Sequence, residues 1–155
     1  MYLSDITTYN EHLVNMIYPG DIEKYWVHYN SYWWQNSQKK EDIECKLVYR
    51  RDEDVEPVGI VAYGAYYRNE ALTMSVSGWY ELIHLVIDKK HQRKGYGEAV
   101  MCLIIEILRH KPDCQEIVIA HNPKNVGARR LYQKLGFVEF DYSYDGDPLM
   151  KLERS

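Results

Sequence analysis

The sequence of 155 residues predicts a mixed α/β fold, in which helices pack against a central sheet. Three observations support this class. Residues 80–87 form a nearly continuous apolar run of strand length, residues 98–111 carry apolar side chains at helical spacing, and a second strand and helix follow at 116–135. The chain contains no internal repeat, low-complexity tract or linker, so we expect one domain over residues 1–155.

The N-terminal part of the chain predicts two short helices and a hairpin. The helices cover residues 10–18 and 21–34, because the Pro19-Gly20 pair between them is a strong helix breaker. Residues 45–50 and 58–67 read as strands rich in β-branched and aromatic side chains, and an acidic turn joins them.

A loop and an apolar strand follow the hairpin. Residues 68–78 lack apolar periodicity and contain Asn, Ser and Gly, so we expect a loop there. The apolar run at 80–87 is typical of a strand that is buried on both faces. The helix at 98–111 ends where three basic residues precede Pro112, which cannot continue a helix.

The last predicted elements are a strand, a capped helix and two closing strands. Residues 116–120 form the strand. Asn125 can cap a helix that runs through Leu135, and Gly136 then stands just beyond the helix end. The closing strands flank a turn at 144–148 and cover residues 137–141 and 149–152.

Composition and charge exclude several classes of protein. A hydrophobic content of 46% argues against disorder, and a net charge of −4 argues against a general nucleic-acid binder. Three scattered cysteines and six histidines without metal-ligand spacing argue against a disulfide framework and against a metal site. The N-terminus lacks the features of a signal peptide and no apolar stretch could span a membrane, so we expect a cytoplasmic protein without a membrane partner.

The charge is unevenly distributed along the chain. Residues 88–134 contain 10 Lys/Arg and 5 Asp/Glu, whereas the remainder contains 9 Lys/Arg and 18 Asp/Glu. Such a separation suits a protein that brings an anionic ligand to a cationic one, although an uneven solvated surface would have the same composition. A motif inside the basic segment favours the functional interpretation.

This motif is a glycine-containing loop between the apolar strand and the helix at 98–111. Gly95 and Gly97 allow the backbone to approach an anion closely, and the start of the helix presents unpaired N–H groups to it. The loop does not match the G-x-x-x-x-G-K-[ST] phosphate loop, and its G-x-G-x-x-G pattern is incomplete. Positive charge is added by Lys90, Arg93 and Lys94.

Two motifs resemble the GNAT family of N-acetyltransferases. The run Gln92-Arg93-Lys94-Gly95-Tyr96-Gly97 is similar to the family's acetyl-CoA pyrophosphate loop, Q/R-x-x-G-x-G/A. Residues 125–137, NVGARRLYQKLGF, resemble its N-x-x-A-x-x-L-Y-x-x-x-G-F segment. The resemblance covers residues 80–141, which would form the acetyl-CoA-binding core, and leaves 1–79 as the acceptor-side region. It implies a GNAT-type fold of about six to seven strands, with helices on both faces of the sheet and a splayed pair of parallel strands.

The resemblance also implies acetyl-CoA as co-substrate and no metal. The cofactor would lie between the strands 81–87 and 116–120, and its pantetheine arm would pair with the backbone of Leu85, Val86 and Ile87. Asn125 would contact the arm from the other side. The pyrophosphate would bind the loop and the first helical turn, namely Gln92, Arg93, Lys94, Gly95, Tyr96, Gly97 and Glu98.

Acetyl transfer to an amine needs a base, an oxyanion donor and an acid. An alkylamine with a pKa of ~10.4 must lose a proton before it attacks, and a nearby carboxylate can take that proton. Glu81 stands eleven residues before Gln92, where the histone-acetylating branch has its catalytic glutamate, and His84 is the rival base. The backbone N–H near Leu85 would stabilise the oxyanion. Tyr132 occupies the family's general-acid position, from which it would protonate the CoA thiolate and contact the cofactor.

The acceptor is less well defined by the sequence. Six aromatic residues within 25–34 and the acidic remainder of the chain favour a small cationic amine such as a polyamine, although the same rings would suit a core or a dimer surface. Residues 140–150 loosely resemble the bacterial polyamine acetyltransferases of the family. A peptide or protein amine, an aminoglycoside and a homodimer stay open.

Two alternatives to an acetyltransferase also stay open. One is a non-catalytic module that binds acetyl-CoA as a sensor, and the other is an acyl-CoA-binding protein for longer chains. The presence of both Glu81 and Tyr132 argues against the sensor, because a module without turnover needs neither an acid nor a base.

Overall fold

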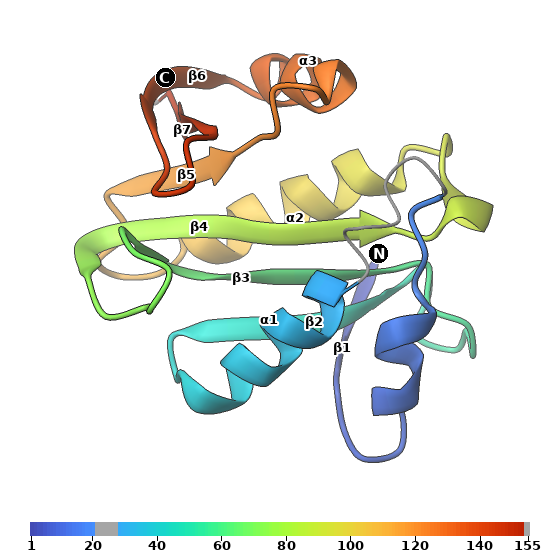
Figure 1. The fold of residues 1–155 in the computed structure, drawn as a ribbon. Helices are drawn as coiled ribbons and strands as arrows, with labels where there is room; N and C mark the ends of the chain where they lie inside the picture. The colour runs from blue at the N-terminus through green and yellow to red at the C-terminus, as the bar shows by residue number, and fades with distance from the viewer. Residues whose placement is uncertain (21–27, 154–155) are drawn as a thin grey trace. The chain divides into compact units, whose positions relative to one another are not determined.

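The computed structural model describes residues 1–20 and 28–153. Its mixed sheet has seven strands, and neighbouring strands follow the order β1-β2-β3-β4-β5-β7-β6 (Figure 1), which confirms the predicted fold class. The strands are β1 (Tyr2–Asp5), β2 (Ile43–Tyr49), β3 (Gly59–Tyr67), β4 (Ser75–Ile87), β5 (Glu116–Ala120), β6 (Phe137–Tyr142) and β7 (Pro148–Leu152). The helices are η1 (Glu11–Met16), α1 (His28–Lys39), η3 (Lys89–His91), α2 (Tyr96–Arg109) and α3 (Val126–Lys134), of which η1 and η3 are 3₁₀ helices.

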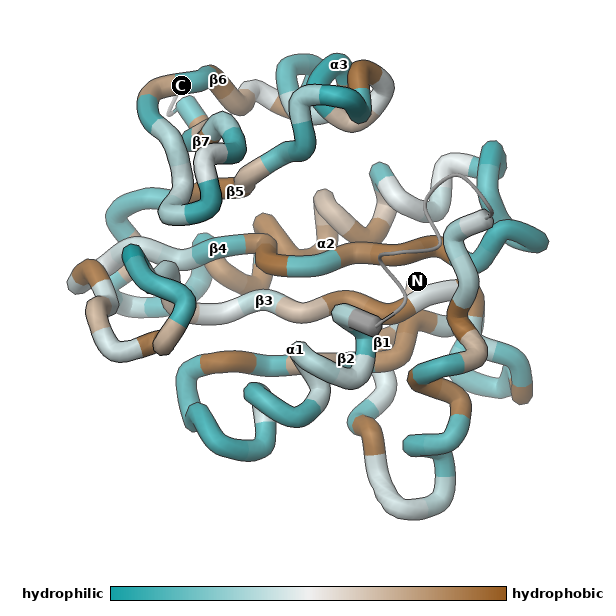
Figure 2. The backbone as a smooth tube through the Cα atoms, in the orientation of Figure 1, coloured by the Kyte–Doolittle hydropathy of each residue, from teal (hydrophilic) through white to brown (hydrophobic). Residues whose placement is uncertain are grey.

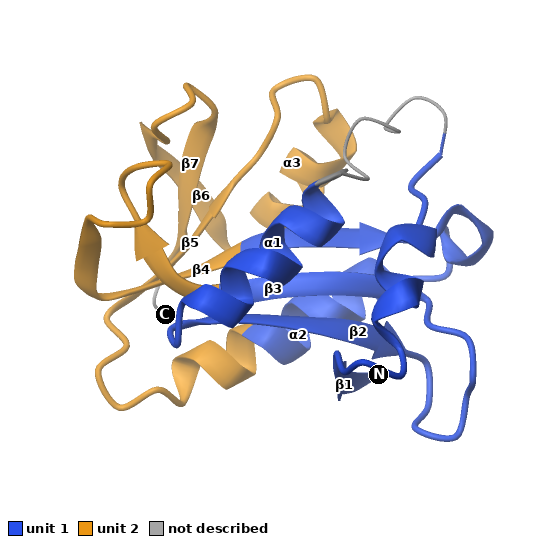
Figure 3. Ribbon diagram, turned by 60° about the horizontal axis from the view of Figure 1, so that its bottom comes forward, with its two compact units in different colours: residues 1–63, 83–104 blue, residues 64–82, 105–155 orange. Residues whose placement is uncertain are grey.

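The chain forms two compact units (Figure 3). Unit 1 consists of Met1–Tyr63 and Ile83–Ile104, and unit 2 consists of Gly64–Leu82 and Ile105–Ser155. Each unit therefore combines two segments that are distant in the sequence, and β3, β4 and α2 each contribute residues to both units.

Unit 1 is built on β1, β2 and the adjoining parts of β3 and β4. β1 pairs with β2 in antiparallel register, with Tyr2 opposite Tyr49. Within this unit α1 and the first part of α2 lie on opposite faces of the strands (Figure 3), and hydrophobic residues concentrate along β3, β4 and α2 (Figure 2). Trp33 and Trp34 of α1 pack against a core that consists of Ile6, Val14, Ile17, Cys45, Leu47, Tyr49, Ile60, Ala62 and Val86.

The part of β4 in unit 1 has two different faces. His84 and Val86 are buried, whereas Ile83, Leu85 and Ile87 are only half-buried. The expectation of a strand buried on both faces is therefore wrong, because alternate side chains of a strand point to opposite faces and one row keeps partial exposure. Ile87 of this row lies on the α2 side, since a Cβ on Gly97 of α2 would be 3.8 Å from its side chain.

Unit 2 contains the parallel strand pair that the sequence analysis predicted. β4 pairs with β5 in parallel register, with Tyr80 opposite Ile117, and β5 pairs with β7 in antiparallel register. Asn125 caps α3 by accepting a hydrogen bond from the Ala128 N–H at 3.0 Å. Gly136 follows the helix with φ +103°, a backbone conformation that favours glycine, so both predicted ends of this helix are confirmed.

Some predicted boundaries are wrong. The segment predicted as a helix at 10–18 is a shorter 3₁₀ helix, and α1 continues to Lys39 instead of ending at residue 34, while residues 21–27 of that predicted helix lie outside the described part. The extension of α1 is polar, but the side chains of Asn36 and Ser37 donate hydrogen bonds to the carbonyls of Tyr32 and Trp34 one turn earlier. Apolar periodicity stops before the helix does.

Two strand boundaries also differ from expectation. β1 was not predicted, because its four residues carry no alternating apolar pattern and it is a strand through its pairing with β2. The loop expected at 68–78 is wrong from Ser75 onward, where β4 begins. Gly78 lies inside this strand at φ +79°, and its carbonyl accepts a hydrogen bond from the Gln115 N–H at 2.7 Å. The glycine that suggested a loop permits a close backbone approach within the strand.

A buried amide links three elements of unit 1. Asn30 of α1 is fully buried, and its Nδ2 donates hydrogen bonds to the carbonyls of Val14 and Ile17 at 3.1 Å each. Its Oδ1 lies 2.7 Å from Nε2 of His84 on β4. One side chain therefore satisfies polar groups at η1, at the residue that follows η1 and on the sheet.

Asn30→Ala should lower the free energy of unfolding by about 2–4 kcal/mol, because it leaves buried polar groups without their partner. Asn36→Ala on the same helix is the matched control, since it changes helix propensity equally but removes only a local hydrogen bond. We expect the control to cost less than about 1 kcal/mol in urea denaturation. Equal costs for the two substitutions would contradict a special role for the buried amide.

Candidate active site

The loop that follows β4 is anchored in unit 1 by Asp88. This carboxylate is buried, and its two oxygens accept hydrogen bonds from the N–H groups of Tyr18 and Lys90, each at 3.0 Å. The backbone reinforces the anchor, because the Lys89 N–H donates to the Tyr18 carbonyl at 2.7 Å. The start of the loop is thereby tied to the segment that follows η1.

Gln92 continues this anchoring at the start of the predicted cofactor loop. Its Nε2 donates to the carbonyls of Pro19 and Ile87, both at 2.9 Å. Both N–H groups of the amide thus donate within the chain, so the Gln92 side chain holds the start of the loop in place. Sequence reasoning assigned this residue to cofactor binding, and the structure adds this supporting role.

The backbone of the loop has an unusual conformation between Gln92 and α2. Arg93 has φ +64° and Gly95 has φ +80°, and both residues are exposed. Successive N–H groups in a turn that contains left-handed residues can point toward a common anion. A non-glycine residue such as Arg93 adopts this region rarely, and such outliers concentrate at functional sites.

The first turn of α2 continues the same surface. The Ala99 N–H donates to the Gly95 carbonyl at 3.1 Å, so the helical hydrogen bonding begins there and the preceding amides lie at the positive end of the helix. A Cβ on Gly95 would meet no atom within 4 Å, which leaves the space above the loop open. Loop and helix start together form a cradle for an anion, with Arg93 and Lys94 exposed beside it.

His84 is tied into the framework of unit 1. Because the Asn30 amide donates to two carbonyls, its Oδ1 is the acceptor toward His84, and the His84 Nε2 must carry a proton. This nitrogen therefore cannot take a proton from a substrate, and only the Nδ1 of His84 could act as a base. Sequence reasoning did not single out Asn30, since a lone polar residue in an aromatic helix carries no motif.

The aromatic segment of unit 1 is divided between core and ring contacts. Trp33 and Trp34 pack on the core of unit 1, and the Tyr32 ring meets the Trp33 ring edge-on at 5.0 Å between centroids. Tyr29 lies 6.5 Å from the His84 ring. Tyr25 and Trp26, which belonged to the same prediction, lie outside the described residues. The two packed tryptophans thus support the interpretation of this segment as core.

Glu81 of β4 belongs to unit 2, where its carboxyl is desolvated. Burial raises the pKa of Glu81 to about 8, and the negative charge of Asp145 acts in the same direction. Burial raises the pKa of Tyr66 as well, and the charge of Glu81 adds to that shift. A carboxyl with a raised pKa is a stronger base than a solvated one, so the environment of Glu81 suits proton transfer near neutral pH.

Tyr132 on α3 is held by two rings in unit 2. The ring of buried Phe137 lies 6.3 Å from the Tyr132 ring, and the ring of buried His121 lies 6.4 Å from it, both in edge-to-face geometry. The Asn125 Oδ1 is used for the helix cap, which leaves the amide Nδ2 for a ligand. Sequence reasoning did not identify His121, because it stands just after β5 and outside both motifs.

Three further properties of the described residues bear on function: metal binding, membrane spanning and a pocket in unit 1. Within residues 1–20 and 28–153 no group of three His, Cys, Asp or Glu side chains could hold a metal ion, and no helix of that part is long and apolar enough to cross a membrane. A pocket of about 390 Å³ in unit 1 is lined by residues of β1, α1 and β2, including Asp5, Trp34 and Lys46. It contains none of the predicted site residues.

Glu81→Gln should change the pH dependence of stability. The pKa of Glu81 is raised in the folded state. Between the ordinary carboxyl pKa and about 8, the folded protein therefore binds more protons than the unfolded protein. The free energy of unfolding consequently falls as the pH rises through this window. We expect the variant to match the wild type near pH 4.5 and to melt several degrees higher near pH 9. Glu70→Gln, which removes an exposed carboxyl, is the matched control in thermal melts at both pH values. A melting temperature of Glu81→Gln that stays at the wild-type value near pH 9 would contradict a desolvated carboxyl.

The chain is similar in sequence or in fold to several known acetyltransferases. A probable spermine N(1)-acetyltransferase from Bacillus subtilis subsp. natto (strain BEST195) is 29% identical over 97 residues, and the match spans 62% of this chain and 62% of that protein. PaiA N-acetyltransferase from Thermoplasma acidophilum, solved in complex with coenzyme A, has a TM-score of 0.70 at 15% identity and covers 99% of this chain and 98% of its own. Aminoglycoside acetyltransferase AAC(6')-Ib, solved with coenzyme A and kanamycin, has a TM-score of 0.73 at 17% identity and covers 98% and 94%. The model of the Acetyltransferase (GNAT) family matches residues 7–137, and this chain belongs to that family.

Proposed function

We propose that this chain is an acetyl-CoA-dependent N-acetyltransferase that transfers an acetyl group to the primary amine of a small molecule. The observation that carries the proposal is the loop of residues 92–97, in which residues 92–95 are exposed, with its two left-handed residues and basic side chains at the start of α2. Such a loop suits the pyrophosphate of CoA. Two proteins of similar fold were solved with coenzyme A bound, which supports the same co-substrate here.

The proposed reaction is a direct attack on the thioester. The amine nitrogen forms a bond to the acetyl carbon, the carbon–sulfur bond breaks, the amine loses a proton and the CoA thiolate gains one. The backbone N–H of Leu85 is the proposed oxyanion donor, and the backbone of Leu85, Val86 and Ile87 is proposed to pair with the pantetheine arm. Leu85 and Ile87 are half-buried, so this part of β4 is partly accessible to solvent.

Glu81 and Tyr132 are the proposed base and acid. A pKa of about 8 makes the ionised Glu81 carboxylate basic enough to accept a proton from an ammonium group, and the ionised fraction grows as the pH rises. Tyr132 is supported in its role by the two rings that hold it, because a proton donor acts efficiently only when its position is defined.

The acidic side chains of unit 2 support a cationic acceptor. Burial raises the pKa values of Glu81 and Asp147, and in each case the charge of Asp145 raises it further, so these carboxylates repel one another. Asp141 belongs to the same group, since its charge, like that of Glu81, raises the pKa of Tyr66. An ammonium group among these carboxylates would relieve the repulsion, which favours a polyamine or another amine with more than one charge.

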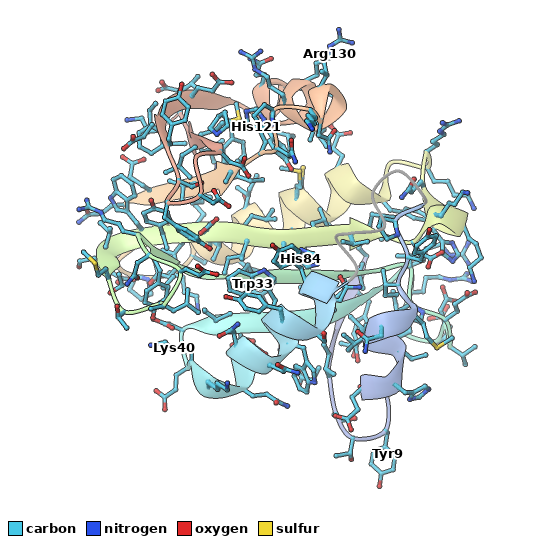
Figure 4. The ribbon with its side chains drawn as sticks, in the orientation of Figure 1. Tyr9, Trp33, Lys40, His84, His121 and Arg130 are labelled. Atoms are coloured by element: carbon cyan, nitrogen blue, oxygen red, sulfur yellow. The ribbon has the colours of Figure 1, made fainter. Side chains whose placement is uncertain are left out.

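Tyr132→Phe should lower kcat by more than about tenfold while the affinity for CoA is kept, because the substitution removes only the proton donor. Steady-state thiol release and calorimetric titration with CoA measure the two quantities. Tyr9→Phe, which changes an exposed tyrosine that points away from unit 1 (Figure 4), is the matched control. Turnover near the wild-type value in Tyr132→Phe would overturn the acid assignment. CoA binding without any thiol release by the wild type would favour the sensor.

The acceptor class can be tested with matched amines. Butane-1,4-diamine and butylamine have the same carbon chain and differ by one charge, and we expect kcat/KM to be at least about tenfold higher for the diamine. Asp145→Asn should reduce this ratio, because it removes one of the carboxylates around Glu81. A panel with a polyamine, an aminoglycoside, a peptide amine and neutral amino acids extends the comparison. Activity confined to neutral amino acids would refute a cationic acceptor.

A further inference from the structure

His121 is a buried titratable side chain in unit 2 that neither sequence motif includes. It follows the last residue of β5, and its backbone N–H donates to the Pro148 carbonyl at 3.1 Å, which extends the pairing of β5 with β7 by one residue. Its side chain is 3% exposed. Burying an imidazole is costly unless its nitrogens find partners, so the surroundings of His121 indicate what the residue does.

The partners of His121 are a carboxylate on β6 and the carbonyl of the next residue. Its Nε2 lies 3.3 Å from Oε1 of Glu139 on β6, and its Nδ1 lies 3.4 Å from the Asn122 carbonyl. The same Glu139 oxygen forms an ion pair with Arg129 on α3, whose Nε lies 2.8 Å away. Glu139 therefore joins the histidine to the helix that carries Tyr132, and Arg129 lies three residues before Tyr132 on the same side of that helix.

The imidazole also contacts the Tyr132 ring directly. The two rings meet at 67° with centroids 6.4 Å apart, and on its other contact the tyrosine meets Phe137 at 62°. Figure 4 shows His121 on the inner side of α3, whereas Arg130 of the same helix projects outward. Two edge-to-face contacts restrict the orientation of the Tyr132 ring more than one does.

We propose that His121 is a positioning residue for Tyr132. Its imidazole, held by Glu139, keeps the phenol ring in the orientation from which the hydroxyl protonates the CoA thiolate. This inference rests on the general-acid role proposed for Tyr132. Histidine suits the task because one planar ring combines an edge for the aromatic contact with a nitrogen for the carboxylate, so the position of the ring is fixed by β6 as well as by packing.

The test is a double-mutant cycle in steady-state kinetics on the whole chain, with acetyl-CoA and the best amine of the panel. His121→Ala should lower kcat about tenfold and leave KM for acetyl-CoA within about twofold, because a misplaced donor weakens the chemical step and not binding. Glu139→Gln should lower kcat in the same direction by a smaller factor. In the Tyr132→Phe background His121→Ala should have no further effect, since the group that it positions is already gone. His110→Ala, which removes an exposed histidine after α2, is the matched control.

Three results would overturn the proposal. A tenfold loss from His121→Ala that persists in full in Tyr132→Phe would mean that the histidine acts by another route, while the acid role of Tyr132 would stand. An unchanged kcat in both His121→Ala and Glu139→Gln would mean that the ring needs no such support. A Tyr132→Phe variant with wild-type kcat would remove the acid role and this inference with it. If His121→Ala does not fold, Glu139→Gln replaces it in the cycle with Tyr132→Phe. Glu139 is half-exposed, so its substitution disturbs the fold less.

Discussion

The hydrogen bonds of Asp88 and Gln92 are the interactions on which the proposed cofactor site depends. An anion cradle needs backbone N–H groups that are free to bind a ligand and yet held in place, which the loop cannot achieve by pairing its own backbone. The Asp88 carboxylate and the Gln92 amide solve this conflict, because they bind the segment at Tyr18 and Pro19 on one side and the end of β4 on the other. Arg93 and Gly95, which have positive φ values, directly follow these anchored residues. Without the hydrogen bonds of Asp88 and Gln92, the loop backbone could relax and its N–H groups would lose their common orientation.

Unit 2 follows a different principle, in which burial tunes the chemistry of side chains. Glu81 and Asp147 have raised pKa values chiefly because they are desolvated, and Asp145 adds the repulsion of a like charge. Tyr132 is confined by rings instead of charges. Two groups in such different environments are suited to opposite tasks, one accepting a proton and the other donating one.

The sequence predicted those elements whose signals are local. The helix from Asn125 to Gly136 was predicted at both ends, because a capping asparagine and a glycine just beyond the helix are properties of neighbouring residues. β5 was predicted at its observed bounds for the same reason, as an apolar run between polar segments. β1, the beginning of β4 and the polar end of α1 were missed or misplaced, since each depends on a hydrogen-bonding partner that the sequence does not display.

By itself the sequence determined the fold class, the glycine loop, the capped helix and, through two motifs, the family to which the chain belongs. It also named Glu81 and Tyr132, but it left the choice between Glu81 and His84 open. The tertiary structure added two facts that bear on this choice: the His84 Nε2 is bonded to the Oδ1 of Asn30, 54 residues away in the chain, and burial raises the pKa of Glu81. The contacts of His121 likewise appear only when β6 and α3 fold against the end of β5. Protonation and orientation depend on neighbours in space, and a motif contains only neighbours in sequence.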